Sequence, residues 1–336
     1  MDRSAREALP FPPVDLMQRV GRMHDDDPVD AYERMGSGLR TLIESMLPDD
    51  WSWSGQRVLD FGCGAGRVLR HFAPEAAGGE FWGSDIDAPS IEWLNQNLCP
   101  PFNAQLSSES PGLPQPDGYF DLIYAISVFT HVSDGWAGWL LELHRLLAEG
   151  GLLLATFLGE GMVDELFSEQ WNEDHIGMNA LRAANPWDLG GPYVLHSPWW
   201  IRAHWGRAFD IVALRPHTGS DGPAGHGLVL LRRKSVHLTV QDLQRLEPDE
   251  PREMSALQHH VEQLRRETLE MGAKSEYLQH RLDAASAECG AQLQQLRDEL
   301  RRSNASRAAI LGSMSWRLTS PLRTAKGVLR QTRSKT

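Results

Sequence analysis

The sequence predicts an α/β protein with a largely parallel sheet, an antiparallel edge hairpin and a long C-terminal coiled-coil helix. From residue 57 onward, short apolar runs alternate with amphipathic helical stretches, as in strand–helix–strand units. The last two apolar runs follow each other without a helix, and a heptad pattern begins after them. We therefore divide the 336 residues into an N-terminal helical lid (1–50), an α/β domain (51–235), a linker (236–253), a coiled coil (254–311) and a basic amphipathic tail (312–336).

The first 50 residues are polar and predict helices. An acidic turn ending at Pro28 precedes one helical stretch and Pro48 follows it, so we expect a helix from Val29 to Met46. Gly36 and Gly38 within this stretch would allow a close approach to a neighbouring segment. We expect the region to cover a ligand as a lid.

Six short apolar runs predict buried strands at residues 58–62, 81–87, 121–128, 152–158, 209–216 and 227–234. Helical stretches lie at residues 66–74, 90–98, 136–151 and 199–208. Because parallel strands need such crossovers, these elements predict a parallel sheet with helices on both faces. The last two runs predict the antiparallel hairpin. Residues 159–195 break the alternation and are interpreted as an insertion.

Charge is distributed unevenly along the chain, whose formal net charge is -12. Residues 1–253 carry a net charge of -18, residues 254–311 a net charge of 0, and residues 312–336 a net charge of +6. The acidic residues 1–253 lack the clustered Lys and Arg that phosphate contacts need, which argues against a nucleic-acid partner. Three cysteines are too few for a disulfide framework, and no apolar run reaches the roughly 20 residues of a membrane span. We therefore expect a cytoplasmic protein.

The segment VLDFGCGAGR, residues 58–67, combines a strand, a glycine-rich turn and a helix start. Its G-x-G-x-G spacing differs from the dinucleotide fingerprint and from the P-loop, which argues against dinucleotide and nucleoside triphosphate ligands. Asp85 ends the next predicted strand, about 20 residues further on, where an acid can bind both hydroxyls of a ribose. A nucleoside ligand without a pyrophosphate fits this pair of features.

These motifs resemble those of class I S-adenosylmethionine-dependent methyltransferases, which have a Rossmann-like methyltransferase sheet. VLDFGCGAGR resembles the family's first motif, and GSDID its acidic second motif. The later segments that resemble the family in the same order are 120–132, 146–157, 196–216 and 225–233. The resemblance covers residues 57–234 and implies S-adenosyl-L-methionine as the cofactor.

The resemblance also implies roles for individual residues. Asp60 would orient the amino group of the cofactor, and Asp85 would bind its ribose hydroxyls. The turn residues expected to hold the methionine part are Gly62, Cys63, Gly64 and Gly66. Ile86 would lie against the adenine, and the residues expected to line the sulfonium side are Ala125 and Ile126.

Transfer to a hydroxyl group benefits from a general base, and His131 is our candidate because it follows the fourth strand. The alternative is that His131 fixes the start of the next helix through a backbone bond. His175 and His196 are weaker candidates. The family's Asn-Pro-Pro-Tyr motif for amino acceptors is absent, since residues 125–128 are Ala-Ile-Ser-Val, which favours oxygen acceptors. No cluster shows the spacing of metal ligands, so no metal is expected.

Two further features bear on the acceptor. Several of the 12 tryptophans cluster in and after the insertion, where they would either contact a sugar or pack in the core: Trp171, Trp187, Trp199, Trp200 and Trp205. Residues 310–323 resemble a short segment at the ends of bacterial glycosyltransferases and methyltransferases of surface-polysaccharide assembly. That resemblance implies a glycan acceptor, with the basic tail docked peripherally on the inner face of the cytoplasmic membrane or on a glycosyltransferase. The alternative for the tail is a solvated basic terminus.

The heptad seam predicts a homo-oligomer through residues 254–311, and a single helix packed on the body is the alternative. Its members are Leu257, Val261, Leu264, Thr268, Met271, Ser275, Leu278, Leu282 and Ala285. For the whole chain we expect a methyltransferase that O-methylates a sugar hydroxyl or a terminal phosphate of a bacterial polysaccharide. One alternative is a methyltransferase for a small-molecule metabolite, with the coil used only for oligomerisation. Another is a non-catalytic scaffold with a methyltransferase fold.

Overall fold

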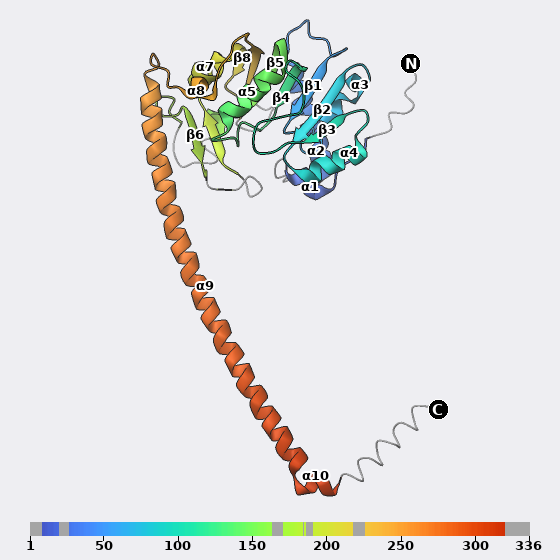
Figure 1. The fold of residues 1–336 in the computed structure, drawn as a ribbon, viewed down its shortest axis with the longest axis vertical. Helices are drawn as coiled ribbons and strands as arrows, with labels where there is room; N and C mark the ends of the chain where they lie inside the picture. The colour runs from blue at the N-terminus through green and yellow to red at the C-terminus, as the bar shows by residue number, and fades with distance from the viewer. Residues whose placement is uncertain are drawn as a thin grey trace, which may run out of the picture. The chain divides into compact units, whose positions relative to one another are not determined.

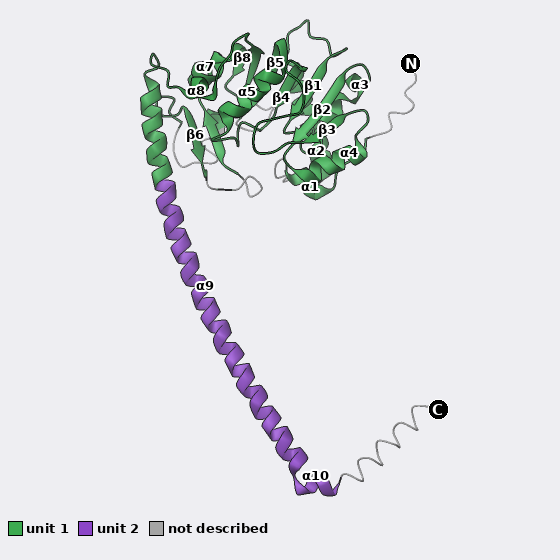
Figure 2. Cartoon of the chain, viewed as in Figure 1, with its two compact units in different colours: residues 1–265 green, residues 266–336 purple. Residues whose placement is uncertain are grey.

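The structure is a computed structural model of the chain and describes residues 9–19, 27–162, 171–183, 185, 191–217 and 226–319. The chain divides into two compact units, residues 1–265 and residues 266–336, coloured separately in Figure 2. The first unit contains the sheet. In its described part, the second consists of most of the long helix α9 (Arg252–Gly312) and the short helix α10 (Met314–Leu318).

One sheet forms the centre of the first unit (Figure 1). Its central strands run parallel in the order β3-β2-β1-β4-β5. Strand β9 pairs with β5 in the antiparallel direction, and β8 pairs with β9 at the edge, which confirms the predicted hairpin. The strands are β1 (Arg57–Phe61), β2 (Glu80–Asp85), β3 (Asn103–Leu106), β4 (Phe120–Ala125), β5 (Leu147–Leu158), β6 (Met178–Leu181), β7 (Tyr193–His196), β8 (Phe209–Arg215) and β9 (His226–Arg233).

Alternate residues of the central strands pack into two separate cores, because successive strand side chains point to opposite faces. On one face, Leu153 and Val229 pack with side chains of α5 (Trp136–Leu146) and α7 (Pro198–His204). On the other face, Leu152 and Leu230 pack with side chains of α2 (Pro28–Glu44) and α4 (Ala88–Asn97). This three-layer arrangement confirms the predicted parallel sheet with helices on both faces.

The N-terminal region is helical in its described part, with α1 (Val14–Arg19) and α2. Asp27 caps α2 by accepting hydrogen bonds from the N–H groups of Val29 and Asp30. Gly36 faces the segment after the glycine turn so closely that an added Cβ would lie 2.3 Å from the carbonyl oxygen of Arg67. A side chain there would force the two segments apart, so this glycine allows their close approach.

Residues 236–253, interpreted from the sequence as a linker, contain a packed helix. They form α8 (Val240–Gln244), which begins with a capping box between Thr239 and Asp242. Leu243 is fully buried in the same core as α5, and α9 starts within this segment at Arg252. The Glu- and Pro-rich composition concealed a short helix that is anchored by Leu243, with the partly buried Val240 packed on the same core.

Four further features of the fold differ from the sequence expectation. The stretch 66–74 forms turns, then a 3-10 helix (Leu69–Phe72) and the one-turn α3 (Ala73–Ala76), because Pro74 lacks the N–H that a continuous helix needs. Helix α5 ends at Leu146, and β5 already begins at Leu147. The insertion supplies a β6–β7 hairpin, and β3 was missed because Asn103 and Gln105 make it polar.

Helix α9 confirms the predicted long C-terminal helix. Its first turns belong to the first unit, where Glu253, Ala256 and Gln263 are buried. The heptad seam falls on other residues, and several of its large apolar members, such as Leu278 and Leu282, are exposed, whereas Leu264 is half-buried. No helix among the described residues has both the length and the apolar character to cross a membrane. The coiled coil itself stays a prediction.

Candidate active site

From the order of the strands, we expect a ligand-binding crevice at the carboxyl ends of β1 and β4. The chain runs from β1 to β2 and β3 on one side, then returns to β4 on the other side of β1. In open parallel sheets, ligands bind at this switch point. The glycine turn follows β1, Asp85 ends β2, and the loop carrying His131 follows β4. The sheet therefore brings together the three segments that the sequence singled out.

The glycine turn is held against the end of β2 and the loop after β4. Gly62 N–H donates to the carbonyl oxygen of Ser84 at 2.7 Å. Gly62, Gly64 and Gly66 all have positive φ angles, of 83°, 52° and 79°. An added Cβ at Gly62 would lie 2.3 Å from Cγ2 of Val128. The turn thus needs glycine both for its backbone conformation and for contact with the β4 loop.

Asp85 is oriented by the backbone around it. Its Oδ2 accepts a hydrogen bond from Gly64 N–H at 2.6 Å, and its Oδ1 accepts one from Asp87 N–H at 2.8 Å. Burial raises the pKa of Asp85, while these two N–H groups act in the opposite direction. Each carboxylate oxygen can accept a further bond, so Asp85 can still receive both ribose hydroxyls.

Asp60 lies on β1 directly below the turn and is only 2% exposed. Its Oδ2 is buried and has no hydrogen-bond partner among the described residues. Burial raises the pKa of Asp60 to about 8. An ionised carboxyl group with one buried oxygen lacking a partner is costly, and a cationic amino group would satisfy that oxygen. The orphaned oxygen therefore fits the role that the resemblance assigns to Asp60.

The remaining predicted cofactor residues contribute differently. The Cys63 side chain is buried beside Gly83, where an added Cβ would lie 2.8 Å from its Sγ, so Cys63 can offer a ligand only its backbone. Burial also raises the pKa of this thiol well above its usual value. Ala125 is fully buried at the end of β4, Ile126 after it is buried in the core on the α2 side, and Ile86 follows the end of β2 half-buried. These assignments stay predictions.

His131 is held in one tautomer by the insertion. Its Nδ1 lies 2.8 Å from the carbonyl oxygen of Pro192. Because a carbonyl can only accept, Nδ1 carries the proton, and Nε2 of the neutral ring keeps its lone pair. The surrounding protein desolvates the ring and lowers the pKa of His131, although the Pro192 bond opposes this effect. The arrangement suits a general base, and the ring contacts the segment before β7 rather than the start of α5, the next helix, where the alternative placed its backbone bond.

The loop between β4 and His131 is tightly organised. Ser127 has a positive φ of 60°, and its N–H donates to Oγ1 of Thr156 at 2.6 Å. Thr130 Oγ1 donates to the carbonyl oxygen of Ser127 at 2.7 Å, and His131 N–H donates to that of Val128 at 2.9 Å. A strained backbone fixed by several bonds is typical of functional loops.

The other candidate histidines lie elsewhere. His196 is fully buried between Trp200 and Trp205, and burial lowers its pKa to about 3, so it is a neutral core residue. His175 stacks on His259 of α9, with ring centroids 5.5 Å apart. Sequence reasoning missed His226, which begins β9. Its pKa is lowered to about 4 by burial first and then by the nearby His131 and Arg67.

The tryptophans after the insertion pack in the core. Trp205 is fully buried, and Trp199 and Trp200 are almost so. This burial favours the core interpretation over sugar contact at these three positions. Trp187 lies outside the described residues.

The N-terminal helices contact the outer side of the cofactor turn. Tyr32 is fully buried on α2, and its hydroxyl donates to the carbonyl oxygen of Ala65 at 3.2 Å. Arg19 of α1 forms an ion pair with Asp87, two residues after Asp85. The region thus braces the turn and reaches the start of α4; its role as a lid stays a prediction.

A parallel sheet with this antiparallel edge, a glycine turn and an acidic neighbouring strand end defines a Rossmann-like methyltransferase fold. The family model for methyltransferase domains matches residues 32–210, more than half of the chain. The chain therefore belongs to the S-adenosylmethionine-dependent methyltransferases, and S-adenosylmethionine is its cofactor.

Comparison with known proteins gives similarities over part of the chain. The malonyl-[acyl-carrier protein] O-methyltransferase of Pectobacterium atrosepticum is 28% identical over 141 residues, which are 42% of this chain and 53% of that protein. The chain thus spans about half the length of this curated relative. A Mesorhizobium loti S-adenosylmethionine-dependent methyltransferase structure is 16% identical, covering 60% of this chain and 100% of its own, with a TM-score of 0.44. The structure of the Synechocystis magnesium protoporphyrin IX methyltransferase with bound SAH is 18% identical. The match covers 66% of this chain and 94% of that chain, with a TM-score of 0.45.

The pKa of Asp60 gives a prediction for cofactor binding. With a pKa of about 8, the carboxyl of the free protein is protonated at neutral pH, and binding of a cationic amino group requires it to ionise. Affinity for S-adenosylhomocysteine should therefore rise roughly tenfold per pH unit from about pH 6 to about pH 8, with proton release on binding. Calorimetry in buffers of different ionisation enthalpy measures both. Asp60→Asn should bind more weakly and lose the proton release; an equal pH dependence in this variant would contradict the assignment.

Proposed function

We propose that this protein is an O-methyltransferase in which His131 is the general base. The observation that carries the proposal is the His131 ring, fixed with its proton on Nδ1 by the Pro192 carbonyl and attached to the loop that touches the glycine turn. Several curated relatives, the malonyl-[acyl-carrier protein] enzymes, are named O-methyltransferases, which supports an oxygen acceptor.

The chain's own residues divide the work of the reaction. When bound, the cofactor supplies an activated methyl group on a sulfonium. Asp60, Asp85 and the glycine turn bind and orient the cofactor, so that proximity provides much of the rate enhancement. The Nε2 atom of His131 accepts the proton of the acceptor hydroxyl as the oxygen becomes a nucleophile. The Pro192 carbonyl then stabilises the imidazolium, because Nδ1–H continues to donate to it.

The acceptor that we propose is a sugar hydroxyl or a terminal phosphate of a polysaccharide. Its support is the resemblance of residues 310–323 to segments of surface-polysaccharide enzymes. The test is mass spectrometry of glycans from strains with and without the gene. We expect each methylated glycan to lose the mass of one methylene per methyl group in the mutant, with restoration by the wild-type gene. Unchanged glycans would contradict this acceptor.

A carboxylate is a second candidate acceptor, because the malonyl-[acyl-carrier protein] relatives are similar to this chain over its methyltransferase domain. A carboxylate is already ionised at neutral pH and needs no base to become nucleophilic. A sugar hydroxyl and a carboxylate therefore differ in their dependence on His131, whereas a terminal phosphate, which is also ionised at neutral pH, resembles the carboxylate. A small-metabolite hydroxyl remains a third acceptor class, which the same glycan comparison separates from a polysaccharide.

We also propose that α9 pairs with copies of itself along the heptad seam. The large apolar seam residues Leu257, Val261, Met271, Leu278 and Leu282 are between 39% and 60% exposed, and burying them would be favourable. The double variant Leu278→Glu, Leu282→Glu should dissociate the oligomer in analytical ultracentrifugation. Leu269→Glu is the matched control, because Leu269 is exposed outside the seam. A monomeric wild-type protein would contradict the pairing.

A cytoplasmic location, with the tail docked on a membrane surface or a glycosyltransferase, completes the proposal. Residues 312–336 carry six cations and no acid, which suits an anionic surface. Most of this tail lies outside the described residues. A chain ending at residue 311 should be recovered less in the membrane fraction, and unaltered fractionation would contradict the docking.

A further inference from the structure

Strand β6 lies at the edge of the sheet, and among the described residues its strand partner is β7 alone. The outward N–H and C=O groups of an edge strand need partners from elsewhere or from water. Strand β7 itself is weakly attached to the central sheet, since within the described part of the chain its pairing with β5 joins Leu158 and Leu195 alone. The hairpin therefore depends on contacts at its outer side.

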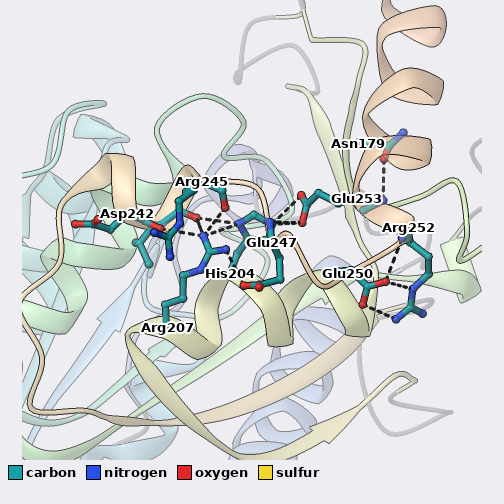
Figure 3. Close-up of polar contacts among 11 residues, drawn as sticks. Asn179, His204, Arg207, Asp242, Arg245, Glu247, Glu250, Arg252 and Glu253 are labelled. Carbon is teal, nitrogen blue, oxygen red and sulfur yellow. Dashed lines mark hydrogen bonds and ion pairs between the residues drawn. The ribbon is translucent and has the colours of Figure 1, made fainter.

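The first turns of α9 supply these contacts within the first unit. Ala180 N–H donates to Nε2 of His260 at 3.0 Å, and Nε2 of Gln263 donates to the carbonyl oxygen of Ala180 at 3.3 Å. Nδ2 of Asn179 donates to Oε1 of Gln263 at 3.3 Å. Figure 3 shows Asn179 beside α9, and the dashed line at Asn179 marks its hydrogen bond to Gln263. Two helix side chains thus bind both outward groups of Ala180, as a further strand would.

The base of α9 is also fastened to the body from a second direction. Both ring nitrogens of the buried His204 face acceptors, since Nδ1 lies 2.8 Å from the Leu243 carbonyl oxygen and Nε2 lies 3.0 Å from the Glu253 carboxylate (Figure 3). Oε2 of Glu253 also accepts a hydrogen bond from Glu247 N–H at 3.1 Å. The first turn of α9 is therefore a fixed support for β6.

The inner side of the hairpin reaches the loop of His131. Ala180 pairs with Val194 across the hairpin. Val194 N–H donates to the carbonyl oxygen of Thr130 at 2.8 Å, and the Pro192 carbonyl accepts from Nδ1 of His131. Hydrogen bonds at the outer and inner sides of the hairpin, and the strand pairing between them, thus connect Gln263 to the His131 ring.

We propose that Gln263, and with it the base of α9, positions His131 by holding the β6–β7 hairpin against the β4 loop. Gln263 is a positioning residue, because it acts through Ala180 and Pro192 and does not reach the crevice. The inference rests on the proposed role of His131 as the base. It gives the helix a part in the active site in addition to any pairing between copies.

The test follows the His131 ring by nitrogen-15 NMR of the full chain and needs no acceptor. The His131→Gln variant assigns its signals among the 13 histidines by their loss. In the wild type we expect the Nδ1–H tautomer and a pKa below the ordinary value of about 6.5. In Gln263→Ala we expect a mixture of tautomers and a pKa closer to the ordinary value. Gln258→Ala, an exposed glutamine on the same helix, should match the wild type.

Gln263→Glu refines the test, because it keeps an acceptor for Asn179 but cannot donate to Ala180 when ionised. It should shift the His131 signals in the same direction as Gln263→Ala. Affinity for S-adenosylhomocysteine should stay within about twofold of wild type in both variants, since the cofactor residues lie on other strands. Unchanged His131 signals in both variants would overturn the inference. Failure of the wild type to bind S-adenosylhomocysteine would instead contradict the proposed function and leave the His131 measurement intact.

Discussion

Replacing Asp85 with alanine should weaken the binding of S-adenosylhomocysteine by at least about 100-fold. The carboxylate would lose hydrogen bonds to two ribose hydroxyls, and bonds to a charged group contribute about 1.5–3 kcal/mol each. The same change removes the acceptor for Gly64 N–H and so loosens the glycine turn. Isothermal titration calorimetry of the full chain measures the loss.

Two variants make this result specific. Asp85→Asn keeps one acceptor oxygen and should bind with intermediate affinity. Asp210→Ala removes an exposed carboxylate on β8, whose contact is an ion pair with Lys234 at 3.6 Å, and should bind as the wild type does. Circular dichroism checks that each variant is folded. If Asp85→Ala bound S-adenosylhomocysteine with wild-type affinity, the assignment of Asp85 to the cofactor site would be contradicted.

Replacing His131 with glutamine should lower kcat/KM for a hydroxyl acceptor by about 10²- to 10⁴-fold, the usual contribution of a general base. Glutamine has a similar length but cannot accept a proton at neutral pH. The assay follows transfer of a labelled methyl group from S-adenosylmethionine to glycans extracted from a strain that lacks the gene. Binding of S-adenosylhomocysteine should change little, because Asp60, Asp85 and the turn remain in place.

This variant also separates the candidate acceptors. With a carboxylate acceptor such as a malonyl thioester, loss of the base should change the rate only slightly. His280→Gln, an exposed histidine on α9, is the matched control and should retain full activity. If His131→Gln transfers methyl groups to a hydroxyl at the wild-type rate, His131 is not the general base and has only a structural role.

Much of the fold was predictable because its signals are local. Apolar runs such as residues 58–62 and 152–158 are buried on both sides of the sheet, so they had to be rich in Leu, Val and Phe. The glycine turn was predictable because its positive φ angles favour glycine. Asp85 was predictable because binding of ribose hydroxyls calls for a carboxylate at this strand end. Strand β3 was missed because it is half-exposed, polar and only four residues long. The packing of Leu243 was missed because one buried side chain creates no periodic pattern.

The parts of the site that the sequence did not reveal depend on contacts between distant segments. Pro192 lies 61 positions from His131, and its contribution is a backbone carbonyl, which any residue could supply. Gln263 lies 83 positions from Ala180 within a helix of ordinary heptad composition. Tertiary structure alone brings such pairs together, so composition and spacing carry no trace of them.

The most direct test of the proposed active site is the diffraction structure of the full chain with S-adenosylhomocysteine. We expect the ribose hydroxyls within hydrogen-bonding distance of the Asp85 carboxylate, the amino group beside Oδ2 of Asp60, and the homocysteine chain against the turn from Gly62 to Gly66. The sulfur should face the loop that carries His131, with Nδ1 of that ring still bound to the Pro192 carbonyl. Ligand density away from β1 and β2, or a sulfur directed away from His131, would contradict the proposed active site.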